Sequence, residues 1–70
     1  MKLEGTVEAG VEAGCMLLQA GGKTYNLVGG DKAMIKDGAD VVVHGSEEPD
    51  MITTCQQGIP FRVTDVQKRR

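Results

Sequence analysis

The chain has 70 residues and a mass of 7.5 kDa, which is enough for one small domain. Its composition, 40% apolar and 26% charged, is that of a soluble globular protein, and no apolar run approaches the roughly 18 residues of a membrane span. Three of the eight basic residues are Lys68, Arg69 and Arg70. Residues 1–67 therefore carry 5 basic against 10 acidic side chains, and this net charge of −5 disfavours tight binding to nucleic acid.

The first half of the chain predicts three strands. Leu3–Glu8 alternates between apolar and polar positions, as a half-buried strand does, and Lys23–Val28 alternates in the same way. Between them lies a short apolar run, Cys15–Ala20, that glycines bound on both sides. Gly21-Gly22 then predicts a two-residue hairpin turn, because glycine adopts the positive φ that such turns require.

The second half predicts a short helix and two further strands. Asp31 can cap a helix over Lys32–Lys36, and Gly38 suits its left-handed end. The β-branched run that begins at Val41 predicts a strand through Gly45, and residues 46–60 predict a polar loop with an extended piece at 51–54. Ile59–Val66 predicts the last strand, in which the parity of Asp65 indicates a bulge or an exposed end.

This order of elements, β-β-β-α-β-β, predicts an all-β fold, a small five-stranded Greek-key OB-like barrel with one short helix. The barrel is expected to span residues 1–67 as a single domain, followed by a basic tail at 68–70. Closure into a barrel would remove the exposed edges of a small open sheet. A half-open roll of the SH3 type is the structural alternative.

The sequence contains no arrangement that is typical of catalysis. Gly21-Gly22-Lys23-Thr24 lacks the upstream glycine and the following helix of a phosphate-binding P-loop. The single histidine, His44, and the single serine, Ser46, lie two residues apart on one predicted strand face, where a solvated surface is the commoner interpretation. We therefore expect a non-enzymatic protein with no catalytic residues, no metal and no cofactor.

The two cysteines, Cys15 and Cys55, predict a disulfide. Their number is even, and in an OB barrel the loops beside them lie on the same side. A bridge would close a loop of about 41 residues and stabilise the domain by roughly 4 kcal/mol. Two buried free thiols are the alternative, and a metal or redox site that uses these cysteines, with His44 as a further ligand, is a weaker one.

A run of uncharged polar side chains between Thr53 and Gln57 offers donors and acceptors for a ligand. The candidate binding residues are Thr53, Thr54, Gln56 and Gln57. The same groups can instead bond to the backbone of their own loop, with Gly58 giving a turn, and this use is common in proteins.

Four segments of the chain resemble a group of small bacterial domains, often actinobacterial, that have an OB-like barrel and no assigned function. The segments are Gly5-Thr6-Val7-Glu8, Glu12-Ala13-Gly14-Cys15, Tyr25-Asn26-Leu27-Val28-Gly29 and Thr53-Thr54-Cys55-Gln56-Gln57-Gly58. The resemblance implies the barrel and a pairing of Cys15 with Cys55, and it implies no catalytic residue.

Taken together, the sequence favours a binding or structural module that acts through its loops on an unknown small ligand or protein, as a monomer. A single-stranded nucleic-acid-binding OB domain is the alternative from another functional class, and it rests on fold analogy alone. No signal peptide precedes the first strand, which predicts a cytoplasmic protein. A location in the cell envelope or outside the cell is expected if the chain is the mature part of an exported protein with a disulfide.

Overall fold

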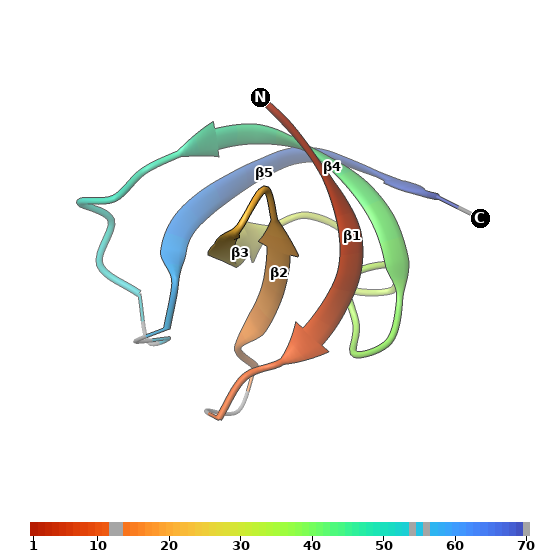
Figure 1. Ribbon diagram of the computed structural model, residues 1–70, viewed down its shortest axis with the longest axis horizontal. Helices are drawn as coiled ribbons and strands as arrows, with labels where there is room; N and C mark the ends of the chain where they lie inside the picture. The colour runs from red at the N-terminus through yellow and green to blue at the C-terminus, as the bar shows by residue number, and fades with distance from the viewer. Residues whose placement is uncertain (12–13, 54, 56, 70) are drawn as a thin grey trace.

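A computed structural model describes residues 1–11, 14–53, 55 and 57–69 of the chain. The fold is all-β: five strands form one closed barrel with the order β1-β2-β3-β5-β4 (Figure 1). The strands are β1 (Lys2–Ala9), β2 (Met16–Ala20), β3 (Lys23–Gly29), β4 (Asp40–Glu47) and β5 (Ile59–Lys68). The predicted all-β class with five strands is confirmed.

Four of the five strand pairs are antiparallel, and β3 with β5 is the parallel one. The long β1 changes partner along its length: Lys2–Thr6 pairs with β4, and Val7–Ala9 pairs with β2. This change of partner closes the barrel, so that the five strands leave no open sheet edge.

The interior of the barrel is apolar throughout. The alternating positions that the sequence marks as inward, such as Leu3 and Val7 on β1, are buried. Phe61 is fully buried, and its ring meets that of Tyr25 edge to face at 5.7 Å between centroids. Val7, Leu18, Val41 and Val43 are fully buried as well. The hydrophobic alternation therefore places the core correctly.

The helix predicted over Lys32–Lys36 is wrong, because the described residues contain no helix and this segment is a series of turns. The local signals are present: Asp31 Oδ1 accepts a hydrogen bond from the Ala33 N–H at 2.9 Å, and Gly38 has a φ of +87°. The Ile35 N–H donates to the Asp31 carbonyl, but the next backbone bond within the segment runs from the Ala39 N–H to the Lys36 carbonyl. One helical turn that no second turn continues is too short to be a helix.

The turn predicted at Gly21-Gly22 and the bulge predicted near Asp65 are both present in the sheet. Gly21 and Gly22 have φ values of +59° and +80°, as the two central residues of a tight hairpin turn require. The register of β4 against β5 shifts after His44, which faces Asp65, so that the ladder skips Thr64 and resumes at Val63. This bulge turns Val66 toward the core and leaves Asp65 exposed.

The expected basic tail begins on the last residue of β5. Lys68 pairs with Val41, and Arg69 donates hydrogen bonds from its backbone N–H to the Asp40 carbonyl and from its side chain to the Asp40 carboxylate, each at 3.0 Å. Arg70 lies outside the described residues.

Candidate functional site

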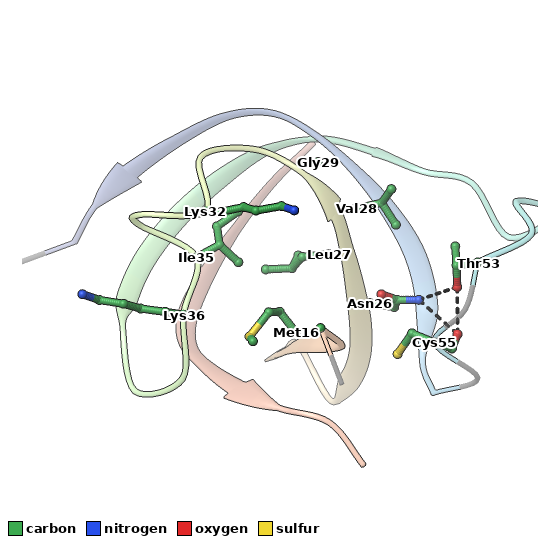
Figure 2. Close-up of a pocket in the computed structure, with 11 residues that line it drawn as sticks. Met16, Asn26, Leu27, Val28, Gly29, Lys32, Ile35, Lys36, Thr53 and Cys55 are labelled. Atoms are coloured by element: carbon green, nitrogen blue, oxygen red, sulfur yellow. Dashed lines mark hydrogen bonds between the residues drawn. The ribbon is translucent and has the colours of Figure 1, made fainter. Parts of the chain in front are cut away.

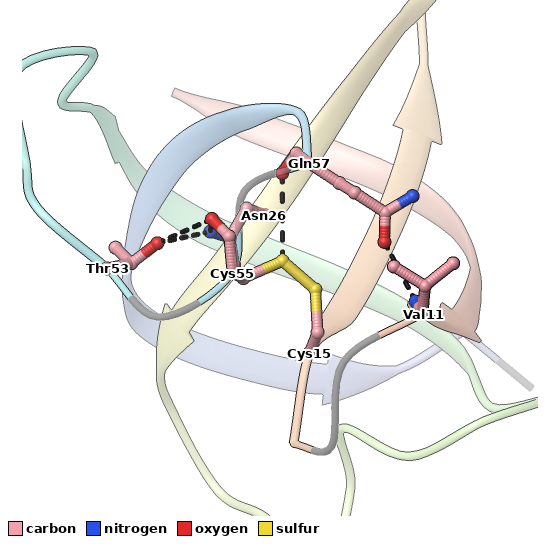
Figure 3. Close-up of a disulfide and its surroundings, with 6 residues drawn as sticks. All are labelled: Val11, Cys15, Asn26, Thr53, Cys55 and Gln57. Atoms are coloured by element: carbon pink, nitrogen blue, oxygen red, sulfur yellow. Dashed lines mark hydrogen bonds between the residues drawn. A yellow bond between two sulfur atoms is a disulfide. The ribbon is translucent and has the colours of Figure 1, made fainter.

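The 10–15 loop, between β1 and β2, and the 48–58 loop, between β4 and β5, meet at one end of the barrel, opposite the Gly21-Gly22 turn (Figure 1). Cys15 and Cys55 lie at disulfide-bonding distance there, with their Cα atoms 5.4 Å apart (Figure 3). Cys15 is buried and Cys55 half-buried. The predicted proximity of the two cysteines is confirmed.

A buried amide attaches the 48–58 loop to the outer face of β3. Asn26 points away from the barrel interior, yet only 3% of its surface is exposed. Its Nδ2 donates to Thr53 Oγ1 at 2.9 Å and to the Cys55 carbonyl at 3.2 Å, and the Thr53 hydroxyl donates to the same carbonyl at 2.8 Å (Figure 3). Because a carbonyl oxygen only accepts hydrogen bonds, it fixes which end of the amide faces the loop.

Gln57 joins the two loops directly. Its side-chain Oε1 accepts a hydrogen bond from the Val11 N–H at 2.8 Å (Figure 3). Thr53 and Gln57, two of the four candidate ligand-binding residues, thus bond within the protein itself. The other two candidates, Thr54 and Gln56, lie outside the described residues.

A cavity of about 430 Å³ lies beside these loops, where β3 extends past the end of β2 (Figure 2). The register of β2 with β3 ends at Leu17 opposite Asn26, whereas β3 pairs with β5 as far as Gly29 opposite Val63. The 30–39 segment, between β3 and β4, covers this gap in the wall and inserts Ile35 into the core. The residues that line the cavity include Met16, Asn26, Leu27, Val28, Ile35, Lys32, Lys36, Thr53 and Cys55.

Two lysines are the charged residues that line the described cavity. Figure 2 shows the side chain of Lys32 extending across the cavity above Leu27, whereas the ammonium group of Lys36 points away from it. Neither lysine forms an ion pair or a side-chain hydrogen bond with another described residue. The cavity therefore combines an apolar floor with a positively charged rim.

An ion pair fixes the start of the 48–58 loop. The Arg62 guanidinium on β5 donates two hydrogen bonds to the Glu48 carboxylate, and the Glu48 N–H donates to the Pro60 carbonyl at 2.8 Å. The hydrogen bond from Arg62 lowers the pKa of Glu48 below its usual value. Nearby, burial and the carboxylate of Glu47 raise the pKa of Tyr25.

The structure does not bring the remaining sequence candidates together with the cysteines. His44 and Ser46 lie on β4, where they face Asp65 and Arg62 of β5. Among the described residues, no group of three or more histidine, cysteine, aspartate or glutamate side chains could hold a metal ion. His44 does not line the cavity either.

Sequence reasoning missed the cavity and the role of Asn26. The alternation of β3 predicts a solvated position for Asn26, and its burial depends on a loop that is distant in the chain. The one local signal is that a strand-breaking asparagine stands between the apolar Tyr25 and Leu27.

No family model, no curated protein and no solved structure matches this chain. Within the residues described, no helix is long and apolar enough to cross a bilayer. The function is therefore argued from the geometry of the site alone.

Proposed function

We propose that this protein is a non-enzymatic binding domain that takes its ligand in the cavity between β3, the 30–39 segment and the 48–58 loop. The observation that carries this proposal is the cavity itself, whose volume of about 430 Å³ lies in the usual range for small-molecule sites. Its lining combines apolar side chains, such as Leu27 and Met16, with polar groups, such as Asn26 and Lys32, as small-molecule sites do.

The finer assignment of the barrel to the OB type, and to the small bacterial group that the sequence resembles, belongs to the same proposal. The strand order β1-β2-β3-β5-β4 and the position of the two loops on one side support it. Binding at the loop end of a barrel is the usual arrangement in this fold class, although a fold alone does not establish a function.

Single-stranded nucleic acid is the less favoured ligand. Bases bind single-strand proteins by stacking on exposed aromatic rings, and both aromatic residues of the chain, Tyr25 and Phe61, are buried in the core. On the outer face of β2 and β3, Leu17 is 8% exposed and Asn26 lies beneath the 48–58 loop. This face is where an OB barrel would receive an oligonucleotide.

The proposal is tested by two-dimensional amide NMR with a library of small aromatic and aliphatic compounds. Hits are expected to shift the resonances of Val28, Lys32 and the Asn26 side chain, which surround the cavity. Val28→Phe adds a ring to a half-buried cavity position and should abolish these shifts. Gln19→Phe adds the same ring at an exposed strand position outside the cavity and should leave them unchanged.

Two results would overturn the proposal. One is a library in which no compound shifts the resonances around the cavity, or in which Val28→Phe binds every hit as well as the parent protein. The other is submicromolar binding of an oligothymidine at physiological salt that survives deletion of residues 68–70, which would establish the nucleic-acid alternative.

A further inference from the structure

We infer that the cavity selects a small monocarboxylate with an apolar body, whose carboxylate pairs with Lys32. This inference rests on the proposed function and names the ligand class of the same site. It depends on three observations: the apolar floor, the sign of the charge on the rim, and the number of donors that the rim supplies.

The floor of the cavity fits an apolar group. Leu27 and Ile35 are 8% and 7% exposed and belong to the core, and Met16 is half-buried beside them. The thioether side chain of Met16 is unbranched and adapts its shape to what packs against it. A ligand body that covers the exposed parts of these side chains removes apolar surface from water, which favours binding.

The charge of the rim selects an anion. The described lining contains the ammonium groups of Lys32 and Lys36 and no carboxylate, in a protein whose acidic residues outnumber its basic ones by ten to eight. Lys32 extends over the apolar floor without a partner among the described residues (Figure 2). Lys32 is exposed, so its ammonium group adds a modest attraction for an anion that the apolar floor holds beside it.

The number of donors favours a carboxylate over a phosphate. Figure 2 shows the ammonium group of Lys32 reaching across the cavity, whereas that of Lys36 points away. The described lining contains no arginine, whose fork of donors suits phosphate oxygens. One ammonium group matches the single negative charge of a carboxylate, whereas a phosphate dianion normally recruits several charged donors.

The test compares four compounds that share one apolar body: 3-phenylpropionate, 3-phenylpropanol, 3-phenylpropylamine and 3-phenylpropyl phosphate. NMR titrations are run on the whole protein, with the amide of Val28 and the side chain of Asn26 as reporters. The carboxylate should bind up to about fivefold more tightly than the alcohol or the amine, as expected for one ion pair with an exposed ammonium group.

The matched variants are Lys32→Met and Lys36→Met, which remove the same charge from neighbouring positions. Lys32→Met should reduce the preference for the carboxylate over the alcohol to about twofold or less, while Lys36→Met should retain most of it. Both lysines are exposed, so neither variant should affect folding, and the unchanged strand resonances serve as the control.

The outcomes separate this inference from the proposed function. If the alcohol or the amine binds as well as the carboxylate and shifts the same resonances, the cavity is a binding site but the ligand class is wrong. The class is also wrong if the phosphate binds most tightly, or if Lys36→Met and Lys32→Met have equal effects. If none of the four compounds, and no member of the wider library, shifts the cavity resonances, the proposed function fails as well.

Discussion

The two sides of the barrel wall are held together by different kinds of interaction. The inner side is a continuous apolar core in which Phe61, Leu18 and Val43 are almost wholly buried. The outer side of β3 carries a buried amide, Asn26, whose partners are a hydroxyl and a carbonyl of the 48–58 loop. Cys15, just before β2, lies at disulfide-bonding distance from Cys55 of that loop.

The core of the barrel and the 48–58 loop therefore respond differently to changes of sequence. Apolar burial has no direction, so a core tolerates exchanges that conserve volume. A layer held by hydrogen bonds depends on individual atoms, because a missing donor leaves an acceptor unpaired. Changes in the core should therefore destabilise the whole domain, whereas changes in the outer layer should first release the 48–58 loop.

The largest effect is expected from the core. Phe61→Ala should lower the free energy of unfolding by about 3–5 kcal/mol, because it removes a fully buried ring and its edge-to-face contact with Tyr25. Chemical denaturation followed by circular dichroism measures the change. Phe61→Leu, which fills more of the space, should cost clearly less. Equal losses for both variants would show that packing volume is not what holds the barrel together.

The second effect concerns the cysteine pair. If Cys15 and Cys55 are joined, reduction should lower the free energy of unfolding by about 4 kcal/mol, since the bridge restrains a long loop of the unfolded chain. Cys15→Ala alone should cost about as much as the double replacement. The strand resonances should persist below the unfolding transition, because the core does not depend on the bridge.

Mass spectrometry checks the pairing itself. Protein handled in air and treated with an alkylating reagent without prior reduction should remain unmodified at both cysteines. Two alkylated thiols would rule the bridge out. They would leave two free thiols as the alternative.

The contrast between the two layers also explains how much the sequence could predict. Strands are encoded by patterns of neighbouring residues, such as the alternation of Leu3 and Val7 around Gly5 or the β-branched run that begins at Val41, and all five strands are found where these patterns place them. The helix prediction is wrong, although Asp31 accepts a capping hydrogen bond and Gly38 has the positive φ of a helix end. Local boundary signals do not provide the consecutive backbone hydrogen bonds that a helix needs.

The outer layer and the cavity depend on contacts between distant parts of the chain. Asn26 and Cys55 are separated by 29 residues, and no local sequence pattern indicates that they form a hydrogen bond. The proximity of Cys15 to Cys55 could be predicted because a barrel topology places their loops together. The cavity could not, since it arises where β3 continues past β2 and the 30–39 segment covers the gap.

A smaller effect is expected at the amide that holds the loop. Asn26→Ala removes the donor to Thr53 and to the Cys55 carbonyl, and should cost about 1–3 kcal/mol. Hydrogen exchange should accelerate in the 48–58 loop more than in β4 or β5. Asn26→Asp keeps the shape but replaces the donor by an acceptor, so it should release the loop at least as strongly. Uniform acceleration across the barrel would contradict a separate outer layer.

The smallest effect is expected from the exposed ion pair at the start of the loop. The hydrogen bond from Arg62 lowers the pKa of Glu48 from its usual 4.5, so the unfolded state binds its proton more readily than the folded one. The stabilisation is therefore complete above that usual pKa and is lost as the pH falls through the lower, folded value. Thermal unfolding measured across this range should show a decline that Arg62→Gln reduces. Lys23→Gln removes an equal charge from a residue without an ion-pair partner in the described structure, and should leave the decline unchanged. If both variants flatten the profile equally, the dependence reflects the net charge of the protein and not the contact between Arg62 and Glu48.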